Sequence, residues 1–179
     1  MKRKELNIEE FKQFVEAQGP DTKIYIGGDS ERFRMPVINE KTGKSESVWF
    51  ADYTIAVIVH IDGSRGAKIF GEMTRERVYD QRKDRPALRL MSEVYKISEM
   101  YLKLHDIIKD HYVEVHLDIN PDEMHGSSCV LNQAIGYIKG TCNVTPMVKP
   151  NAFAASYAAD RLKEIFMMRG DTLEVKDAA

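Results

Sequence analysis

Apolar residues follow two different patterns along this chain. The first pattern consists of short apolar runs, which are typical of strands. Turn signals separate the apolar runs: the TGKSES stretch around Gly43 and the DGSRG stretch at residues 62–66. Residues 32–38 can extend the first run into a hairpin arm. We therefore predict three strands in an antiparallel meander, at residues 23–29, 48–61 and 67–73.

Beyond residue 75 the apolar residues take a helical period and alternate with further strands. Pro86 suits the first position of a helix, and the residues after it form one apolar stripe that predicts a helix over 86–109. The stripe consists of Leu90, Val94, Ile97, Tyr101, Leu104 and Ile108. The remaining expected elements are a strand at 112–119, a helix at 127–139 ended by Gly140, a strand at 141–149 and a helix at 151–168.

This order predicts an α/β fold with a mixed five-stranded sheet and helices on both faces. Its first three strands would be the antiparallel meander. A chain of 179 residues holds one domain comfortably. We expect a short N-terminal helix within residues 1–20, one folded domain over 21–168, and a flexible tail at 169–179.

Composition places the chain among soluble globular proteins, with 43% hydrophobic and 30% charged residues. No apolar run reaches the length that crosses a membrane, and the first residues contain no apolar signal segment. The only cysteines, Cys129 and Cys142, have no ligand spacing typical of zinc. We expect a cytoplasmic protein without a membrane partner.

The net charge of −2 argues against a protein that coats nucleic acid by charge alone. Basic residues nevertheless concentrate in residues 75–89, which hold six of them against three acids. This stretch fits a solvated loop and helix start, and it fits a phosphate-contacting patch equally well. The candidate contacts to nucleic acid are Arg82, Lys83, Arg85 and Arg89.

Two acids close apolar strands in a similar way. Asp29 follows two glycines, which would let another backbone or a ligand approach, and Asp118 ends the strand at 112–119. Read alone, Asp29 is most simply a turn residue. If the two strands are adjacent and parallel, however, the carboxylates repel each other unless cations neutralise them. Such oxygen ligands suit Mg²⁺ or Mn²⁺, and two ions would activate water and stabilise the leaving oxygen of a phosphodiester.

Two further acids lie in predicted helices. Glu93 falls on the flank of the apolar stripe, where its carboxylate could reach the sheet edge; a boundary glutamate paired along the helix is the alternative. Asp160 lies opposite the apolar face of the last helix, so the pattern predicts exposure. The alanine-rich turn before Asp160 would still permit close packing on another backbone.

Four segments resemble the ribonuclease H-like superfamily, and within it the YkuK-like family: IYIGGDS, MSEVY, VHLDIN and KPNAFAASYAADR, spread over residues 24–161. The resemblance implies a metal-dependent phosphodiesterase. Its metal ligands would be Asp29, Glu93, Asp118 and Asp160, holding two Mg²⁺ or Mn²⁺ ions. For Asp160 the resemblance replaces the expected exposure with a place in the metal cluster.

Two more residues are candidates for catalysis. His125, in the loop after Asp118, could shuttle a proton, although a surface histidine is the simpler interpretation. Lys149, at the end of the strand predicted at 141–149, could face the scissile phosphate, or it could be an ordinary strand-end lysine.

The leading hypothesis is hydrolysis of structured nucleic acid, such as an RNA–DNA hybrid or branched DNA. The alternative is a catalytically silent module of the same fold that binds nucleic acid or protein. A small actin-like ATPase shares this kind of core, but 179 residues hold only one such core and no glycine-rich phosphate loop is present.

Overall fold

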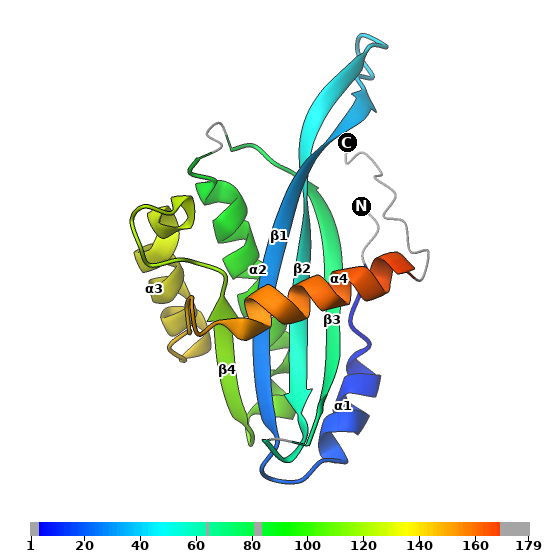
Figure 1. The fold of residues 1–179 in the computed structure, drawn as a ribbon. Coiled ribbons are helices and arrows are strands. Elements are labelled where there is room, and N and C mark those ends of the chain that lie inside the picture. The colour runs from blue at the N-terminus through cyan, green and yellow to red at the C-terminus, as the bar shows by residue number, and fades with distance from the viewer. Residues whose placement is uncertain (1–3, 64, 81–83, 169–179) are drawn as a thin grey trace.

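The computed structural model describes residues 4–63, 65–80 and 84–168. Within these residues the sheet has four strands in the order β3-β2-β1-β4, with helices on both faces (Figure 1). The strands are β1 (Lys23–Ile38), β2 (Ser45–His60), β3 (Ala67–Arg77) and β4 (Tyr112–Leu117). The mixed α/β architecture predicted from the sequence is therefore confirmed.

The first helix and the long helix lie close to their predicted positions, whereas the helices predicted at 127–139 and 151–168 begin later, after a short turn of another helical type. The α-helices are α1 (Ile8–Glu16), α2 (Ala87–Ile108), α3 (Leu131–Cys142) and α4 (Ala159–Met168). The Asn7 side chain caps α1 by accepting a hydrogen bond from the Glu10 backbone N–H. Short 3₁₀ turns occupy Ile61–Gly63 and Gly126–Val130, and a π-helical turn, Ala154–Ala158, leads directly into α4. No helix in the described part of the chain is long and apolar enough to cross a membrane.

The strand pairing confirms the meander and brings the first and fourth strands together. β1 pairs antiparallel with β2 along its whole length, and β2 pairs antiparallel with β3. β1 also pairs in parallel with β4, from Lys23 beside Tyr112 to Gly28 beside Leu117. Asp29 and Asp118 each follow the last residues of this parallel pairing. The two acids therefore lie at the same end of adjacent strands.

The predicted fifth strand at 141–149 is wrong. Helix α3 runs through Gly140 to Cys142 and ends at Asn143, whose left-handed backbone (φ 56°) closes the helix. Only Met147 then forms a parallel bridge with His116 of β4. Pro146 has no N–H to donate to a ladder, so the segment follows β4 without becoming a strand.

β1 and β2 extend well beyond the other strands, which confirms the hairpin arm. The pairing of β3 stops at Phe50, and the rest of the hairpin continues to Ile38 and Ser45 as a two-stranded arm (Figure 1). At the base of this arm the guanidinium groups of Arg32 and Arg34 lie 4.2 and 4.5 Å from the centre of the Trp49 ring. Such cation–π contacts stiffen an arm that has no neighbouring strand.

The sheet separates two apolar layers. On one side, α1, α2 and α3 cover the larger core, which includes Phe11, Ile26, Val57, Ile97 and Ile138. On the other side, α4 and the π-turn cover a smaller core, which includes Ala56, Ile58, Ala154, Leu162 and Phe166. β2 lies between both layers and is buried from Phe50 to Val59, as its continuous apolar run predicts.

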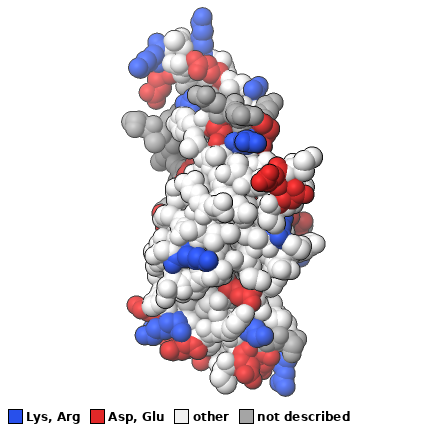
Figure 2. Space-filling model, turned by 90° about the vertical axis from the view of Figure 1, so that its left-hand side faces the viewer, with Lys and Arg blue, Asp and Glu red and all other residues white. Residues whose placement is uncertain are grey.

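Charged side chains do not form one continuous basic surface on the face drawn in Figure 2. Lysines, arginines and acids there stand singly or in groups of mixed sign around a largely uncharged centre. This scatter agrees with the net charge of −2.

Candidate active site

The glycines before Asp29 allow close contact on both faces of β1. A Cβ on Gly27 would lie 2.6 Å from the backbone nitrogen of Ala155, so β1 and the π-turn touch backbone to backbone. A Cβ on Gly28 would lie 2.6 Å from the Ile55 side chain, beneath α2. The close approach predicted for this glycine pair is therefore present. On the α4 side of β1, the backbone that approaches is the π-turn.

Asp29 and Asp118 face the layer that contains α4. Asp29 shares its side of β1 with Gly27, and Asp118 accepts a hydrogen bond at 3.0 Å from Ser156 Oγ in the π-turn. Burial raises the pKa of Asp29, and the negative charge of Asp118 raises that pKa further. The two acids are thus electrostatically coupled, as adjacent parallel strands predict.

Glu93 reaches the same site from α2, on the other side of the sheet. Its side chain is buried, and Ser30 Oγ donates a hydrogen bond to its Oε2 at 2.7 Å. Burial, followed by the charge of Asp29, raises the pKa of Glu93 to about 8. The folded chain therefore holds a proton on Glu93 at neutral pH.

Ser30 is a site residue that the sequence interpretation missed. The sequence suggests a turn former, but Ser30 lies in the middle of β1, paired with Tyr53. Alternation along β1 turns it away from Asp29 and toward α2, where it meets Glu93. That alternation, continued past Asp29, was the signal that could have found it.

Arg89 completes this part of the site. Its guanidinium donates to the Ser30 backbone oxygen at 2.6 Å and to Ser30 Oγ at 2.5 Å. Its positive charge lowers the pKa of both Asp29 and Glu93, against the larger effect of burial. A residue predicted to contact phosphate thus lies beside the acids.

Lys149 also lies in the site. Its Nζ is 2.7 Å from Oδ1 of Asp118, and its side chain is 41% exposed. The backbone directs it there, because the Lys149 N–H donates to the Ile119 oxygen just beyond β4. The ammonium group therefore neutralises one acid and remains accessible from solvent.

Asp160 lies at the edge of the site rather than inside it. It is the second residue of α4 and is exposed, as the pattern predicts. Its charge nevertheless contributes to the raised pKa of Asp29. The π-turn places Ala154, Ala155 and Ala158 against the sheet and thereby brings the start of α4 within electrostatic range of Asp29.

His116 fixes the π-turn in place, which the sequence did not indicate. Its ring is fully buried, and its Nδ1 accepts a hydrogen bond from the Ala154 N–H at 3.1 Å. Its Nε2 lies 2.8 Å from Oε2 of Glu114. Since Nδ1 accepts, the proton is on Nε2 and is donated to Glu114. Burial lowers the pKa of His116, which keeps the ring neutral.

The other predicted residues are more dispersed. His125 is exposed in the loop after Asp118, and within the described residues no hydrogen bond or ion pair joins its ring to an acid. Arg85 is exposed before α2, while Arg82 and Lys83 lie outside the described residues. Arg75, in the same basic stretch, instead forms a two-fold hydrogen-bonded ion pair with the buried Asp52, so this part of the stretch is structural.

The donor chemistry of the site fits a hard divalent cation. Carboxylate oxygens from two strands and two helices repel one another, and a cation would relieve that repulsion. Among the described residues no three acids, histidines or cysteines lie close enough to hold a metal in the arrangement seen. Binding would require Lys149 to leave Asp118 and Glu93 to lose its proton.

Comparison with known proteins agrees with this geometry. The family model described as Ribonuclease H-like matches residues 7–164, a span that runs from the start of α1 into α4 and includes all four acids. No curated protein and no solved structure matches the chain. The family match covers most of the 179 residues. The chain therefore belongs to the ribonuclease H-like family.

Proposed function

We propose that this protein hydrolyses phosphodiester bonds in structured nucleic acid, such as an RNA–DNA hybrid or branched DNA, with two Mg²⁺ or Mn²⁺ ions. One observation carries the proposal: the parallel pairing of β1 and β4 brings Asp29 and Asp118 to the same end of adjacent strands, and Glu93 reaches Ser30, the residue after Asp29, from α2. Family membership supports the same reaction class. The resemblance to YkuK-like chains remains part of this proposal.

Clustered acids with raised pKa values are typical of functional sites. Acids that only stabilise a fold are usually paired with cations, as Asp52 is with Arg75. At the proposed site the pKa values of Asp29 and Glu93 are raised by burial and by neighbouring acids, although Arg89 lies beside both. Bound divalent ions would activate water and stabilise the leaving oxygen.

In this proposal each site residue has a separate role. Asp29 and Asp118 would hold the cations through their carboxylate oxygens, and Glu93 and Asp160 would complete the ligand set from the two helices. Ser30 holds the Glu93 carboxyl in place through its hydrogen bond to Oε2. Lys149, once released from Asp118, would donate a hydrogen bond from its Nζ to a phosphate oxygen. His125 accepts or returns a proton from its exposed loop.

An activity screen tests the proposal. Hybrid, duplex, single-stranded and junction substrates are incubated with the protein in Mn²⁺ or in EDTA. We expect cleavage of at least one structured substrate in Mn²⁺ only, and its loss in Asp29→Asn. Asp106→Asn is the matched control, because Asp106 is exposed on α2 and its side chain is 95% accessible. Equal cleavage by both variants would contradict the assignment of Asp29.

A catalytically silent module is the second candidate, and one observation favours it. Lys149 on Asp118 and the proton on Glu93 already neutralise part of the acid cluster from within the chain. Such a module would bind nucleic acid or a protein without cleavage. It would also gain no thermal stability from Mn²⁺, which separates it from the nuclease.

A further inference from the structure

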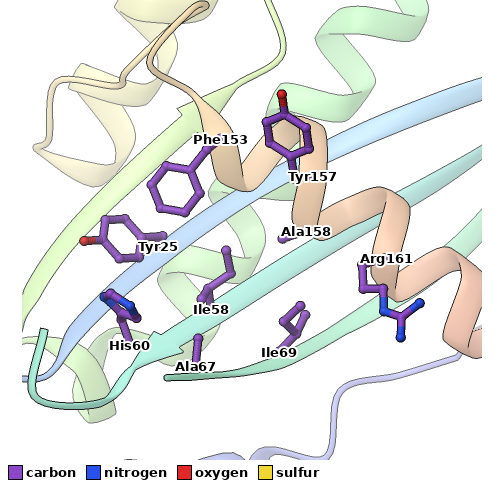
Figure 3. Close-up of a pocket in the computed structure, with 9 residues that line it drawn as sticks. All are labelled: Tyr25, Ile58, His60, Ala67, Ile69, Phe153, Tyr157, Ala158 and Arg161. Atoms are coloured by element: carbon purple, nitrogen blue, oxygen red, sulfur yellow. The ribbon is translucent and has the colours of Figure 1, made fainter. Parts of the chain in front are cut away.

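A pocket of about 530 Å³ opens on the α4 side of the sheet (Figure 3). Ile58 and Ile69 form its floor. Tyr25 and Phe153 stand at one end and Arg161 at the other, while Tyr157 projects from the π-turn above it. The pocket is thus apolar in its depth, aromatic on its rim and cationic at one end.

A second hollow of about 340 Å³ lies beside this pocket, on the side of Asp118. It is lined by Lys149 and Ser156, both of which contact Asp118. Phe153 and Tyr157 line both hollows. The two aromatic rings therefore lie between the candidate active site and the apolar pocket.

Both aromatic rings are available for stacking. Tyr157 is 79% exposed and Phe153 is 41% exposed, so both rings are accessible from solvent. The Phe153 ring packs edge-on against Tyr25, with ring centres 4.8 Å apart, so its position is fixed. Exposed aromatic rings beside cations are typical of surfaces that bind unpaired bases.

The charges around both hollows suit a polyanion. No aspartate or glutamate is among the described residues that line them. Lys149 lies near the acid end, and Arg161 lies at the far end. Arg161 pairs with Glu164 on the surface at 2.9 Å, but its side chain is 60% exposed, and such a pair is weak in water. A phosphate can therefore compete for its remaining donors.

We propose that the apolar pocket takes an unpaired nucleobase from the strand whose phosphate lies at the acids. The inference rests on the proposed function for the position of that strand. Tyr25 and Asp29 are four residues apart on β1, about 13 Å along the strand. The base therefore belongs to a nucleotide a short distance from the scissile phosphate.

This assignment narrows the substrate class. A continuous duplex keeps every base stacked and paired, and extruding one base requires unstacking energy. A junction, flap or single strand offers an unpaired base without that requirement. The protein is therefore expected to prefer branched or partly single-stranded nucleic acid over a fully paired hybrid.

Binding of labelled oligonucleotides in EDTA tests the pocket without cleavage. Fluorescence anisotropy compares a single strand, an abasic strand of the same length and a full duplex. We expect the base-containing strand to bind at least about fivefold more tightly than the abasic one, as base–aromatic stacking predicts.

Two variants should remove this preference. Ala67→Trp fills the pocket from an exposed position on β3, and Tyr157→Ala removes an exposed ring, so both are expected to fold. Tyr95→Ala removes a half-exposed ring from α2, on the other side of the sheet, and should keep the preference. Melting temperatures verify the fold of each variant.

Equal binding of base-containing and abasic strands by the unmodified protein would overturn the inference. So would an unchanged preference in Ala67→Trp. The proposed nuclease function can fail without the pocket assignment. If no substrate is cleaved in Mn²⁺, the pocket assignment still stands when the unmodified protein prefers base-containing strands and Ala67→Trp loses that preference. Cleavage without any preference for bases would remove the pocket assignment alone.

Discussion

Glu93 is the residue at which burial and charge act together most strongly. Its carboxyl group is almost inaccessible to solvent, and Asp29 and Asp118 both disfavour its ionisation. The hydrogen bond from Ser30 and the charge of Arg89 act in the opposite direction without overcoming burial. The result is a buried group that exchanges its proton close to physiological pH.

This raised pKa predicts how stability depends on pH in EDTA. The pKa of Glu93 rises from an ordinary 4.5 to about 8 on folding. The folded chain then holds a proton that the unfolded chain releases, so the contribution of Glu93 to the free energy of unfolding falls between these two values as pH rises. The decline is at most about 1.4 kcal/mol per pH unit.

Urea unfolding at several pH values measures this decline. Glu93→Gln keeps the shape and cannot ionise, so its stability should lack this component and exceed that of the unmodified protein at the alkaline end. Parallel curves for the two proteins would show that folding does not change the pKa of Glu93.

Asp160 provides a second residue-scale prediction. Because Asp160 is exposed, Asp160→Asn should change the free energy of unfolding by less than about 0.5 kcal/mol. If Asp160 is a metal ligand, the same variant should lose most of the Mn²⁺-induced rise in melting temperature and any nuclease activity. Retention of both responses would make Asp160 a surface residue.

At the scale of elements, the contact between β1 and the π-turn positions the site. The π-turn carries Ser156 and leads into Asp160, and its backbone rests on β1 at Gly27. His116 holds the first residue of the turn from β4. Any side chain on Gly27 must therefore push the turn away from Asp29 and Asp118.

Gly27→Ala tests this contact. A Cβ at 2.6 Å from the Ala155 backbone nitrogen forces a shift of backbone, which should lower the free energy of unfolding by about 1–3 kcal/mol. Gly136→Ala in α3 is the matched control. Nothing lies within 4 Å of its added Cβ, so this variant should be neutral or gain up to about 1 kcal/mol. Urea unfolding compares the two, and equal stabilities would refute the contact.

The elements also show which parts of the fold the sequence predicts. Long periodic patterns were sufficient to predict α2 and the meander, because their apolar runs are buried on one or both faces. The strand predicted at 141–149 is wrong because Gly140 looked like a helix end, whereas α3 continues to Cys142 and closes at Asn143. The π-turn changes the helical phase, and a wheel drawn at a uniform 100° per residue cannot represent it.

Predicting the site depended on topology more than on local pattern. Asp29 and Asp118 could be placed together because each ends an apolar strand and the strands were expected side by side. Lys149 and Arg89 were chosen for other reasons and lie beside the acids. Their contacts depend on long-range packing, which neither periodicity nor spacing along the chain contains.

For the molecule as a whole, the basic stretch at residues 75–89 is the candidate contact with nucleic acid phosphates. If residues 82, 83 and 85 contact phosphate, replacing Arg82, Lys83 and Arg85 with alanine should weaken binding and flatten its salt dependence by about one log unit of slope per lost contact. The control replaces an equal number of exposed lysines on or next to the helices with alanine, namely Lys12, Lys109 and Lys139. Identical slopes in both variants would leave the basic stretch a solvated loop.

Calorimetric titration with Mn²⁺ tests the central claim, that these acids form a two-cation site. Measured at pH 7 in buffers of different ionisation enthalpy, the titration gives both the number of ions bound and the number of protons released. The account predicts two ions and about one proton, released by Glu93 as the cations lower its pKa. Asp29→Asn should abolish both. Absence of saturable Mn²⁺ binding to the unmodified protein would contradict the account.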